Sequence, residues 1–281
     1  MSRNIQDSLG PAPEAAGHQV KYIETVDAYN KWAEVYDTDG NFLQALDTIE
    51  MHNLLPYFLS RIQAESAPGD TLKLVDLGCG TGRNTLQLAN LAPPTAQIIG
   101  IDASPGMLAV AKSTLEAEAA GAVSTGRVTL GEYDLLSPMS PIPVSLQDGG
   151  ASGIISTLVL EHITVGLFFE GAARLIKPGG YFLVTNMHAE MGAISQAGFV
   201  DERTGTKIRP TSYAHAIGDV VAAAERVGFE VIALDEAGER VRETKVEQGM
   251  VKALGVRGKK WVGVTVWFGI CFAYRPEMNG R

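Results

Sequence analysis

The stretch LVDLGCGTGRN, which runs from Leu74 to Asn84, decides the fold of this chain. Its first four residues are of strand type, glycines stand at positions 78, 80 and 82, and a helical pattern follows. Glycine accepts a positive φ and has no Cβ, so the backbone of such a turn can approach a bound molecule closely. The N-terminus of the next helix favours negative charge. The stretch therefore predicts a strand, a ligand-binding turn and a helix.

Downstream of this stretch, short strand-like runs alternate with helical patterns. Such alternation is typical of βαβ units around a parallel sheet. We expect strands at residues 72–77, 97–102, 127–134, 153–160 and 181–186, and two more at 229–234 and 262–274. The predicted fold class is α/β, a Rossmann-like doubly wound sheet of five parallel strands plus a C-terminal antiparallel strand pair, with an N-terminal helical lid.

Three segments are predicted along the chain. Residues 1–20 mix Pro, Gly, Ala and Ser without periodicity and are expected to form a flexible leader. Residues 21–66 are expected to form the helical lid, because their apolar side chains repeat at helical spacing. Residues 67–281 are expected to form the ligand-binding domain, in which the long connection at about 187–210 shapes a substrate pocket.

The amino-acid composition limits the classes of molecule that this chain is expected to bind. A net charge of -9 disfavours nucleic acid as a partner, and the basic cluster of Arg257, Lys259 and Lys260 is interpreted as solvated. No signal peptide or apolar run of membrane-spanning length is present, so we expect no membrane partner and a cytoplasmic location. Cys79 and Cys271 lack metal-ligand spacing, so no metal is expected. We expect a monomer or a weak dimer.

Two acidic residues end the strands that follow the glycine turn. Asp102 stands where Rossmann-type sites place a carboxylate against ribose hydroxyls. It could instead cap the next helix, but Ser104 fills that role better. Asp134 closes the third strand, where it could accept from the exocyclic amine of adenine, although a lone aspartate there is usually a turn former. Together they predict an adenosine-containing ligand.

At this point the chain resembles the class I S-adenosylmethionine (SAM)-dependent methyltransferases. The matching segments, in the family's order and spacing, are residues 75–82, 101–108, 133–135, 156–162 and 175–180. One departure is that residues 152–155 lack the aspartate that often opens the fourth strand. The resemblance implies a SAM-dependent methyltransferase that releases S-adenosylhomocysteine (SAH).

The resemblance also implies cofactor contacts. Gly78 and its neighbours would hold the methionyl end, Asp102 the ribose, Asp134 with the Leu135 amide the adenine, and Met107 would pack on the purine. The aromatic residues of the lid would close the pocket, although ordinary packing also explains such a stripe. The cofactor-binding residues so implied are Tyr29, Trp32, Tyr36, Asp76, Gly78, Gly80, Gly82, Asp102, Ala103, Met107, Asp134, Leu135, Thr157 and Leu158.

The acceptor is expected beyond the C-terminal ends of the strands, where three histidines occur. His188 follows the fifth strand and is the first candidate for a general base, because imidazole titrates near neutral pH. His215, in the first turn of a helix, is the second. His162 is expected to wall the cofactor. A purely structural role remains open for each of the three.

Several functions remain open at this stage. The leading one is methyl transfer to a small molecule. The SYAH segment at 212–215 and the terminus at 262–276 are similar to fungal secondary-metabolism methyltransferases, including those that S-methylate dithiols such as reduced gliotoxin. O- or N-methylation and SAM binding without methyl transfer are alternatives. A nicotinamide oxidoreductase would place its third glycine one residue after Gly82.

Overall fold

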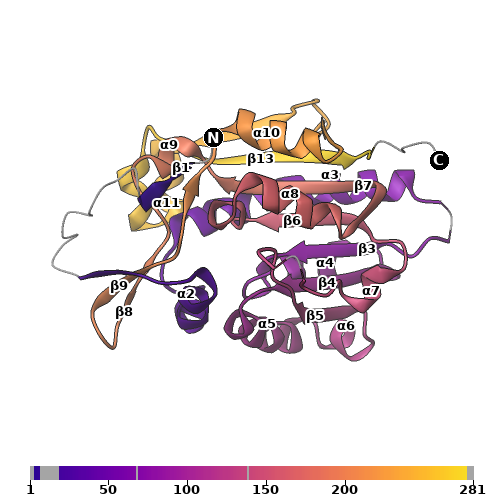
Figure 1. Ribbon diagram of the computed structural model, residues 1–281, viewed down its shortest axis with the longest axis horizontal. Coiled ribbons are helices and arrows are strands. Elements are labelled where there is room, and N and C mark those ends of the chain that lie inside the picture. The colour runs from indigo at the N-terminus through magenta and orange to yellow at the C-terminus, as the bar shows by residue number, and fades with distance from the viewer. Residues whose placement is uncertain (1–2, 7–18, 68, 138, 277–281) are drawn as a thin grey trace.

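An eight-stranded sheet forms the centre of the fold (Figure 1). The structure, a computed structural model, describes residues 3–6, 19–67, 69–137 and 139–276. Seven strands run in the order β11-β13-β7-β6-β3-β4-β5, and β12 also pairs with β13. Their bounds are β3 (Lys73–Leu77), β4 (Gln97–Asp102), β5 (Val128–Glu132), β6 (Ala151–Thr157), β7 (Ile176–Met187), β11 (Phe229–Ile232), β12 (Val241–Lys245) and β13 (Thr265–Tyr274).

The predicted fold class is confirmed. Strands β5, β4, β3, β6 and β7 pair in parallel, whereas β13 runs antiparallel to β7 and to β11. The expected C-terminal strand pair is present, and β12 adds a strand that the sequence analysis did not predict. Its sequence, VRETK, carries no apolar alternation, because both of its faces are at least partly exposed.

Helices cover both faces of the sheet. On one face, α3 (Phe42–Glu65), α4 (Arg83–Leu91) and the end of α5 (Pro105–Glu118) pack against side chains such as Leu74 and Leu183. On the other face, α8 (Val165–Ala173) and α10 (Ile217–Arg226) pack against Val75 and Phe182. Other helices in the described ranges are α6 (Ala120–Ser124), α7 (Val144–Gln147), α9 (Ala189–Gly192), α11 (Val251–Leu254), η1 (Ala33–Val35), η2 (Leu160–His162), η3 (Gln248–Met250) and η4 (Val256–Trp261).

The segment predicted to be a lid divides into two parts. Helix α2 (Thr25–Trp32) and η1 lie apart from the sheet (Figure 1), in a small cluster with Met107 and Phe199. Helix α3 instead belongs to the core, because Leu46, Leu55 and Leu59 are buried in the cluster that covers the sheet. Only α2 and η1 therefore have the position of a lid.

The segment at 187–210 carries part of a second, three-stranded sheet. Strand β9 (Thr206–Arg209) lies between β8 (Phe199–Asp201) and β2 (Val20–Tyr22). At the other end of the predicted leader, β1 (Arg3–Asn4) pairs with β10 (Tyr213–Ala214), and Ile5 is buried. Residues 7–18 of that leader lie outside the described residues.

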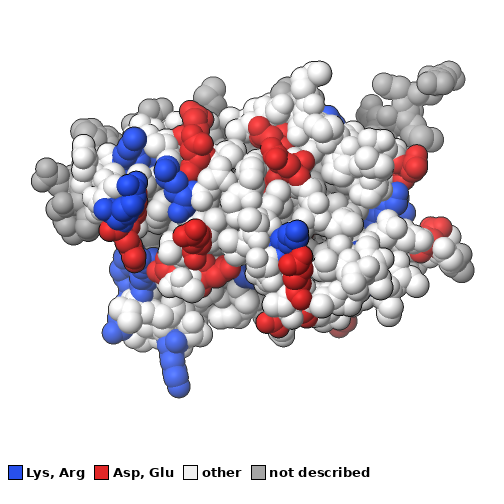
Figure 2. Space-filling model, turned by 90° about the horizontal axis from the view of Figure 1, so that it is seen from below, with Lys and Arg blue, Asp and Glu red and all other residues white. Residues whose placement is uncertain are grey.

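Charge is unevenly distributed over the surface. In Figure 2, Lys and Arg gather most densely at the left end of the molecule, the end where Figure 1 places β8, β9 and α11. None of the helices in the described ranges is long and apolar enough to cross a membrane.

Candidate cofactor site

A cavity lies at the C-terminal ends of β3, β4, β5 and β6, with α2 and Tyr36, the residue after η1, over it. Parallel strands end at the same edge of a sheet, which brings together the turns that follow them. Many of the residues expected to bind a cofactor line this cavity: Tyr29, Tyr36, Gly78, Gly80, Asp102, Ala103, Met107, Asp134, Leu135, Thr157 and Leu158. Three others do not line it: Trp32 borders a different cavity, Asp76 is buried behind the turn, and Gly82 is the N-cap of α4.

The turn after β3 requires glycine for two separate reasons. Gly78 has a φ of 75°, and a Cβ there would stand 2.3 Å from Cγ2 of Val159. Gly80 has a φ of 53°, but its Cβ position is open. A side chain at Gly78 would collide with the chain, whereas Gly80 is needed for its left-handed backbone.

Asp102 fixes the floor of the cavity. Its Oδ2 accepts from the Gly80 N–H at 2.9 Å, and its Oδ1 accepts from the Ser104 N–H at 2.8 Å. Burial raises the pKa of Asp102, and these two N–H donors oppose the rise. Asp134 is held similarly, because its Oδ1 accepts from the Leu136 N–H at 2.8 Å. Both carboxylates keep further acceptor positions for a ligand that donates hydrogen bonds.

The wall after β6 contains an unusual backbone conformation. Leu158, with a φ of 57°, is the one non-glycine residue at positive φ among the described residues. Its N–H donates to the Thr185 carbonyl at 2.9 Å, which ties it to β7. Such a conformation is uncommon for a bulky side chain and occurs where the surroundings enforce it, often at functional sites. It lies in the lining of the cavity.

The lid is attached to the domain on both of its sides. Oδ1 of Asn30 accepts from the Gly106 N–H at 2.9 Å and from the Ser104 hydroxyl at 2.8 Å, at the start of α5. On the opposite side, the Tyr29 hydroxyl lies 2.7 Å from Nε2 of His162. A carbonyl oxygen only accepts, so Nδ1 of His162 donates to the Thr211 carbonyl, 2.8 Å away, and in this tautomer Nε2 can accept from the Tyr29 hydroxyl.

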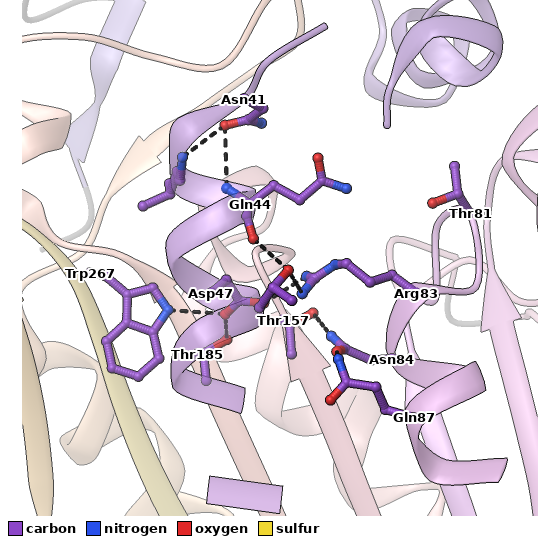
Figure 3. Close-up of polar contacts among 12 residues, drawn as sticks. Asn41, Gln44, Asp47, Thr81, Arg83, Asn84, Gln87, Thr157, Thr185 and Trp267 are labelled. Atoms are coloured by element: carbon purple, nitrogen blue, oxygen red, sulfur yellow. Dashed lines mark hydrogen bonds and ion pairs between the residues drawn. The ribbon is translucent and has the colours of Figure 1, made fainter. Parts of the chain in front are cut away.

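Behind the glycine turn, a network of polar side chains joins α4 to four other elements (Figure 3). Asp47 of α3 is completely buried and accepts from Thr185 at 2.5 Å, from Nε1 of Trp267 at 2.9 Å and from Arg83 at 2.6 Å. Asn84 donates to Thr157 at 2.8 Å in the same region. The residues that follow the turn are thereby fixed to α3, β6, β7 and β13.

The two histidines expected to be catalytic lie away from this cavity. His188 accepts from the Glu190 N–H at the start of α9, and its Nε2 lies 2.9 Å from Glu243. His215 is completely buried, and its Nε2 contacts the carbonyl oxygens of Leu160 and Ile163. Burial lowers the pKa of His215. Neither histidine lines the cavity, whereas His162, expected only to wall it, does.

Sequence reasoning did not single out Asn30, Asp47 or Arg83. Asn30 could have been noticed, because it lies within the aromatic stretch that forms the lid. Asp47 and Arg83 carry no such signal. Their roles depend on Thr185 and Trp267, which are far away in the sequence.

Two family models match parts of the chain. One, described as a methyltransferase domain, matches residues 75–184, and the other, described as the ubiE/COQ5 methyltransferase family, matches residues 18–128. An uncharacterized methyltransferase of Emericella nidulans is 62% identical over 96% of this chain and 99% of its own length. A demethylmenaquinone methyltransferase of Symbiobacterium thermophilum is 28% identical over 67% of each chain.

Solved structures share the fold. A SAM-dependent methyltransferase of Mesorhizobium loti superposes with a TM-score of 0.52 at 19% identity, over 76% of this chain and 96% of its own. The phosphoethanolamine N-methyltransferase 2 of Haemonchus contortus, in complex with phosphomonomethylethanolamine and SAH, gives a TM-score of 0.54 at 17% identity, over 98% of this chain and 61% of its own. At these identities the likeness shows the fold alone.

Proposed function

Since the chain belongs to the SAM-dependent methyltransferases, we propose that the cavity under α2 holds SAM and that the chain methylates a small molecule. The observation that carries the proposal is the pair Asp102 and Asp134 at the ends of neighbouring strands, both in the lining of one cavity. Carboxylates in these positions can accept from ribose hydroxyls and from an exocyclic amine.

The residues of the cavity fit this cofactor. No atom of the described residues lies within 4 Å of the Cβ position of Gly80, which leaves space for a ligand beside the turn. Met107 and Leu135 are apolar side chains of the lining, suited to the faces of a purine. When bound, SAM supplies a methyl group on a positively charged sulfur. An acceptor atom can bond to the methyl carbon from the side opposite the sulfur, which then leaves. This cavity thus combines carboxylate oxygens with apolar side chains, as small-molecule sites generally do.

The role of the lid is to orient the reactants and to exclude water. Tyr29 and Tyr36 line the cavity from above, and Tyr29 is fastened to His162. Burial, followed by the charges of neighbouring groups, raises the pKa of Tyr29 well above its usual value, so its hydroxyl stays protonated and keeps donating to His162. A closed, dry site holds reactants in a near-attack arrangement, which supplies much of the rate of a displacement.

A small acceptor is favoured because the site is covered. The lining of the cavity comes from α2 and Tyr36 on one side and from the strand ends on the other, so a bound molecule lies between them. Among protic acceptors, a thiol needs the least help from a protein base in losing its proton, because its pKa of ~8.5 makes it partly ionised at neutral pH. We therefore place a dithiol first among the acceptors to test, and hydroxyl and amine acceptors next.

The test is turnover with labelled SAM on matched sets of small dithiols, phenols, alcohols and amines. Formation of SAH together with a methylated product supports the proposal. Tight binding of SAM with no SAH formed on any set, or on an extract of small metabolites, would favour a binding protein without methyl transfer. Binding of NAD in place of SAM, measured by calorimetry, would contradict the cofactor assignment.

A further inference from the structure

A second cavity, of about 420 Å³, borders the other side of the lid. Trp32 lines it, whereas Tyr29 and Tyr36, whose rings lie 5.6 and 5.2 Å from that of Trp32, line the cofactor cavity. The two cavities thus adjoin at these aromatic rings. Glu161 lines the second cavity and the next residue, His162, lines the first, so the cavities also meet at η2.

Part of the lining of the second cavity consists of flat, apolar aromatic rings. Trp32 stacks on Phe199 with ring centroids 5.1 Å apart, and Phe42 stacks on Trp261 with centroids 5.4 Å apart, each pair at 20° between the ring planes. Stacked aromatic pairs offer rigid faces on which a planar or apolar body can pack. A cavity of this volume has the size of a small-molecule site.

Buried polar atoms in this lining have no hydrogen-bond partner in the described protein. They are Oε2 of Glu161, Oε1 of Gln196 and Nε1 of Trp261. The three side chains are more than nine-tenths buried, with exposed fractions of 5%, 7% and 2%. Buried polar atoms are nearly always paired, so three orphaned ones on side chains that line one cavity point to a bound ligand as the source of their partners. Two of these atoms are acceptors and one is a donor.

Glu161 lies where the two cavities adjoin. Its Oε1 is 3.4 Å from Nε2 of His162. The pKa values of Tyr29 and Tyr36, which line the cofactor cavity, are raised. Burial is the largest cause for both, and the charge of Glu161 is a smaller one that acts in the same direction. A carboxylate in this position can accept the proton of an acceptor group that points toward the cofactor cavity.

The outer part of the second cavity is basic. Lys207, Arg257, Lys259 and Lys260 line it, and the last three are exposed, which places them toward solvent. Arg257 lies 3.9 Å from Asp39, while Lys207, Lys259 and Lys260 pair with no carboxylate among the described residues. The pKa of Lys207 is lowered, mainly by burial. The nearby cations Arg209, Lys260 and Arg257 lower it further. Several like charges converge here in a chain whose net charge is -9.

We propose that this second cavity is the acceptor site, and that the acceptor is a small carboxylic acid with an apolar body and a protic nucleophile. Its carboxylate binds Lys207, Lys259 and Lys260, its apolar body packs on the stacked rings, and its N–H, O–H or S–H points to Glu161. The acceptor lone pair forms the bond to the methyl carbon, the electrons of the breaking C–S bond return to sulfur, and the acceptor proton passes to Glu161. The inference rests on the proposed function, because it assumes methyl transfer.

The test is binding, measured by calorimetry on the full chain saturated with SAH, so that no turnover occurs. The probes are para-hydroxybenzoate and its neutral amide, para-hydroxybenzamide, which differ in charge and little in shape. We expect the acid to bind at least about tenfold more tightly than the amide, as charge-assisted contacts to ammonium groups require. Lys207→Met and, separately, Lys260→Met should reduce this preference at least about fivefold, whereas Lys112→Met, at an exposed position on α5, should leave it unchanged.

Each outcome has a distinct meaning. Equal affinity for acid and amide, or no binding of either by chain that binds SAH, overturns the acidic acceptor and leaves the proposed function standing. A preference for the acid that survives both Lys207→Met and Lys260→Met overturns the location in the second cavity. Failure to bind SAH contradicts the proposed function itself. Lys260 is exposed, so its variant remains informative even if Lys207→Met fails to fold.

Discussion

Nη2 of Arg83 donates to Oδ2 of Asp47 at 2.6 Å, and the Asp47 side chain is completely buried while that of Arg83 is 21% exposed. The pair joins the first residue of α4, directly after the glycine turn, to α3. Because Asp47 also accepts from Thr185 and Trp267, it fixes the turn to the centre of the sheet (Figure 3). The backbone that faces the cofactor cavity is therefore held from behind.

We expect Asp47→Ala to lower the free energy of unfolding by about 3 to 5 kcal/mol, because it leaves a largely buried guanidinium without its anion. The measurement is urea denaturation. The control is Glu116→Ala, which removes a partner of the exposed Lys112–Glu116 pair and should cost at most about 1 kcal/mol. Adding Arg83→Met to Asp47→Ala should restore part of the loss. Equal losses for Asp47→Ala and Glu116→Ala would show that the network does not hold the fold.

We expect Asp102→Ala to weaken SAH binding at least about tenfold, because a charged acceptor of ribose hydroxyls contributes about 1.5 to 3 kcal/mol. Calorimetry measures the dissociation constant. Glu132→Ala is the matched control, since Glu132 lies beside Asp102 in the sheet register but is exposed and outside the cavity lining. An unchanged constant in folded Asp102→Ala protein would remove the central assignment of the cofactor site.

We expect Tyr29→Phe to speed the release of SAH roughly 5- to 150-fold. The change removes the hydroxyl that donates to His162 and leaves a buried nitrogen without a donor when the lid is closed. Leaving such a group unpaired costs about 1 to 3 kcal/mol. Stopped-flow displacement of SAH measures the rate. Tyr57→Phe, on α3 and outside the cofactor cavity, should release SAH at the wild-type rate, and identical rates in both variants would sink the lid interpretation.

We expect His188→Ala to change turnover less than about threefold at any pH, because His188 contacts Glu243 and the start of α9 and lines neither cavity. The check is a rate-versus-pH profile at saturating SAM on the acceptor found in the panel. Glu161→Gln, which alters a carboxylate in the lining of the acceptor cavity, serves as the contrast. A loss of more than about tenfold in His188→Ala would return this histidine to the catalytic role.

The same rate-versus-pH profile shows whether the acceptor atom needs a general base to remove its proton. With a thiol acceptor, Glu161→Gln should lower the rate modestly, and raising the pH toward ~9 should restore it, because solvent then supplies the thiolate. With an alcohol acceptor, the loss should be on the order of 100-fold and should persist at that pH. A large, pH-independent loss on a thiol would contradict a mechanism in which Glu161 only receives the acceptor proton.

Burial raises the pKa of Asp76 to about 6, although the hydrogen bond from Thr85 opposes the rise. Relative to an unfolded pKa near ~3.9, the folded state binds this proton more tightly, so the free energy of unfolding falls as pH rises between about 4 and 6. In Asp76→Asn the free energy of unfolding does not show this fall, because asparagine does not ionise. We expect the stability of Asp76→Asn relative to wild type to increase by about 2 to 3 kcal/mol from pH 4 to pH 7. Urea denaturation at both values measures it, and a constant difference would refute the raised pKa.

Much of the fold was predictable because its signals are local. The strand before Gly78, the glycine turn and the acidic strand ends are short patterns, and parallel strands necessarily bring their C-terminal ends to one edge. Asp102 and Asp134 could therefore be placed in one site from the sequence. Strand β12 could not be predicted, because an exposed strand with the sequence VRETK has no apolar alternation to reveal it.

The sequence by itself determined the fold class and the residues expected to surround a cofactor, since these follow from periodicity and turn chemistry. Only the tertiary structure decided what lies around them. It set His188 and His215 apart from the cavities, and it brought Lys207 to the cluster of Arg257, Lys259 and Lys260 that the sequence alone suggested was merely solvated. The physical reason is that side-chain neighbours from distant segments depend on packing, as Asp47 and Trp267 do across 220 residues.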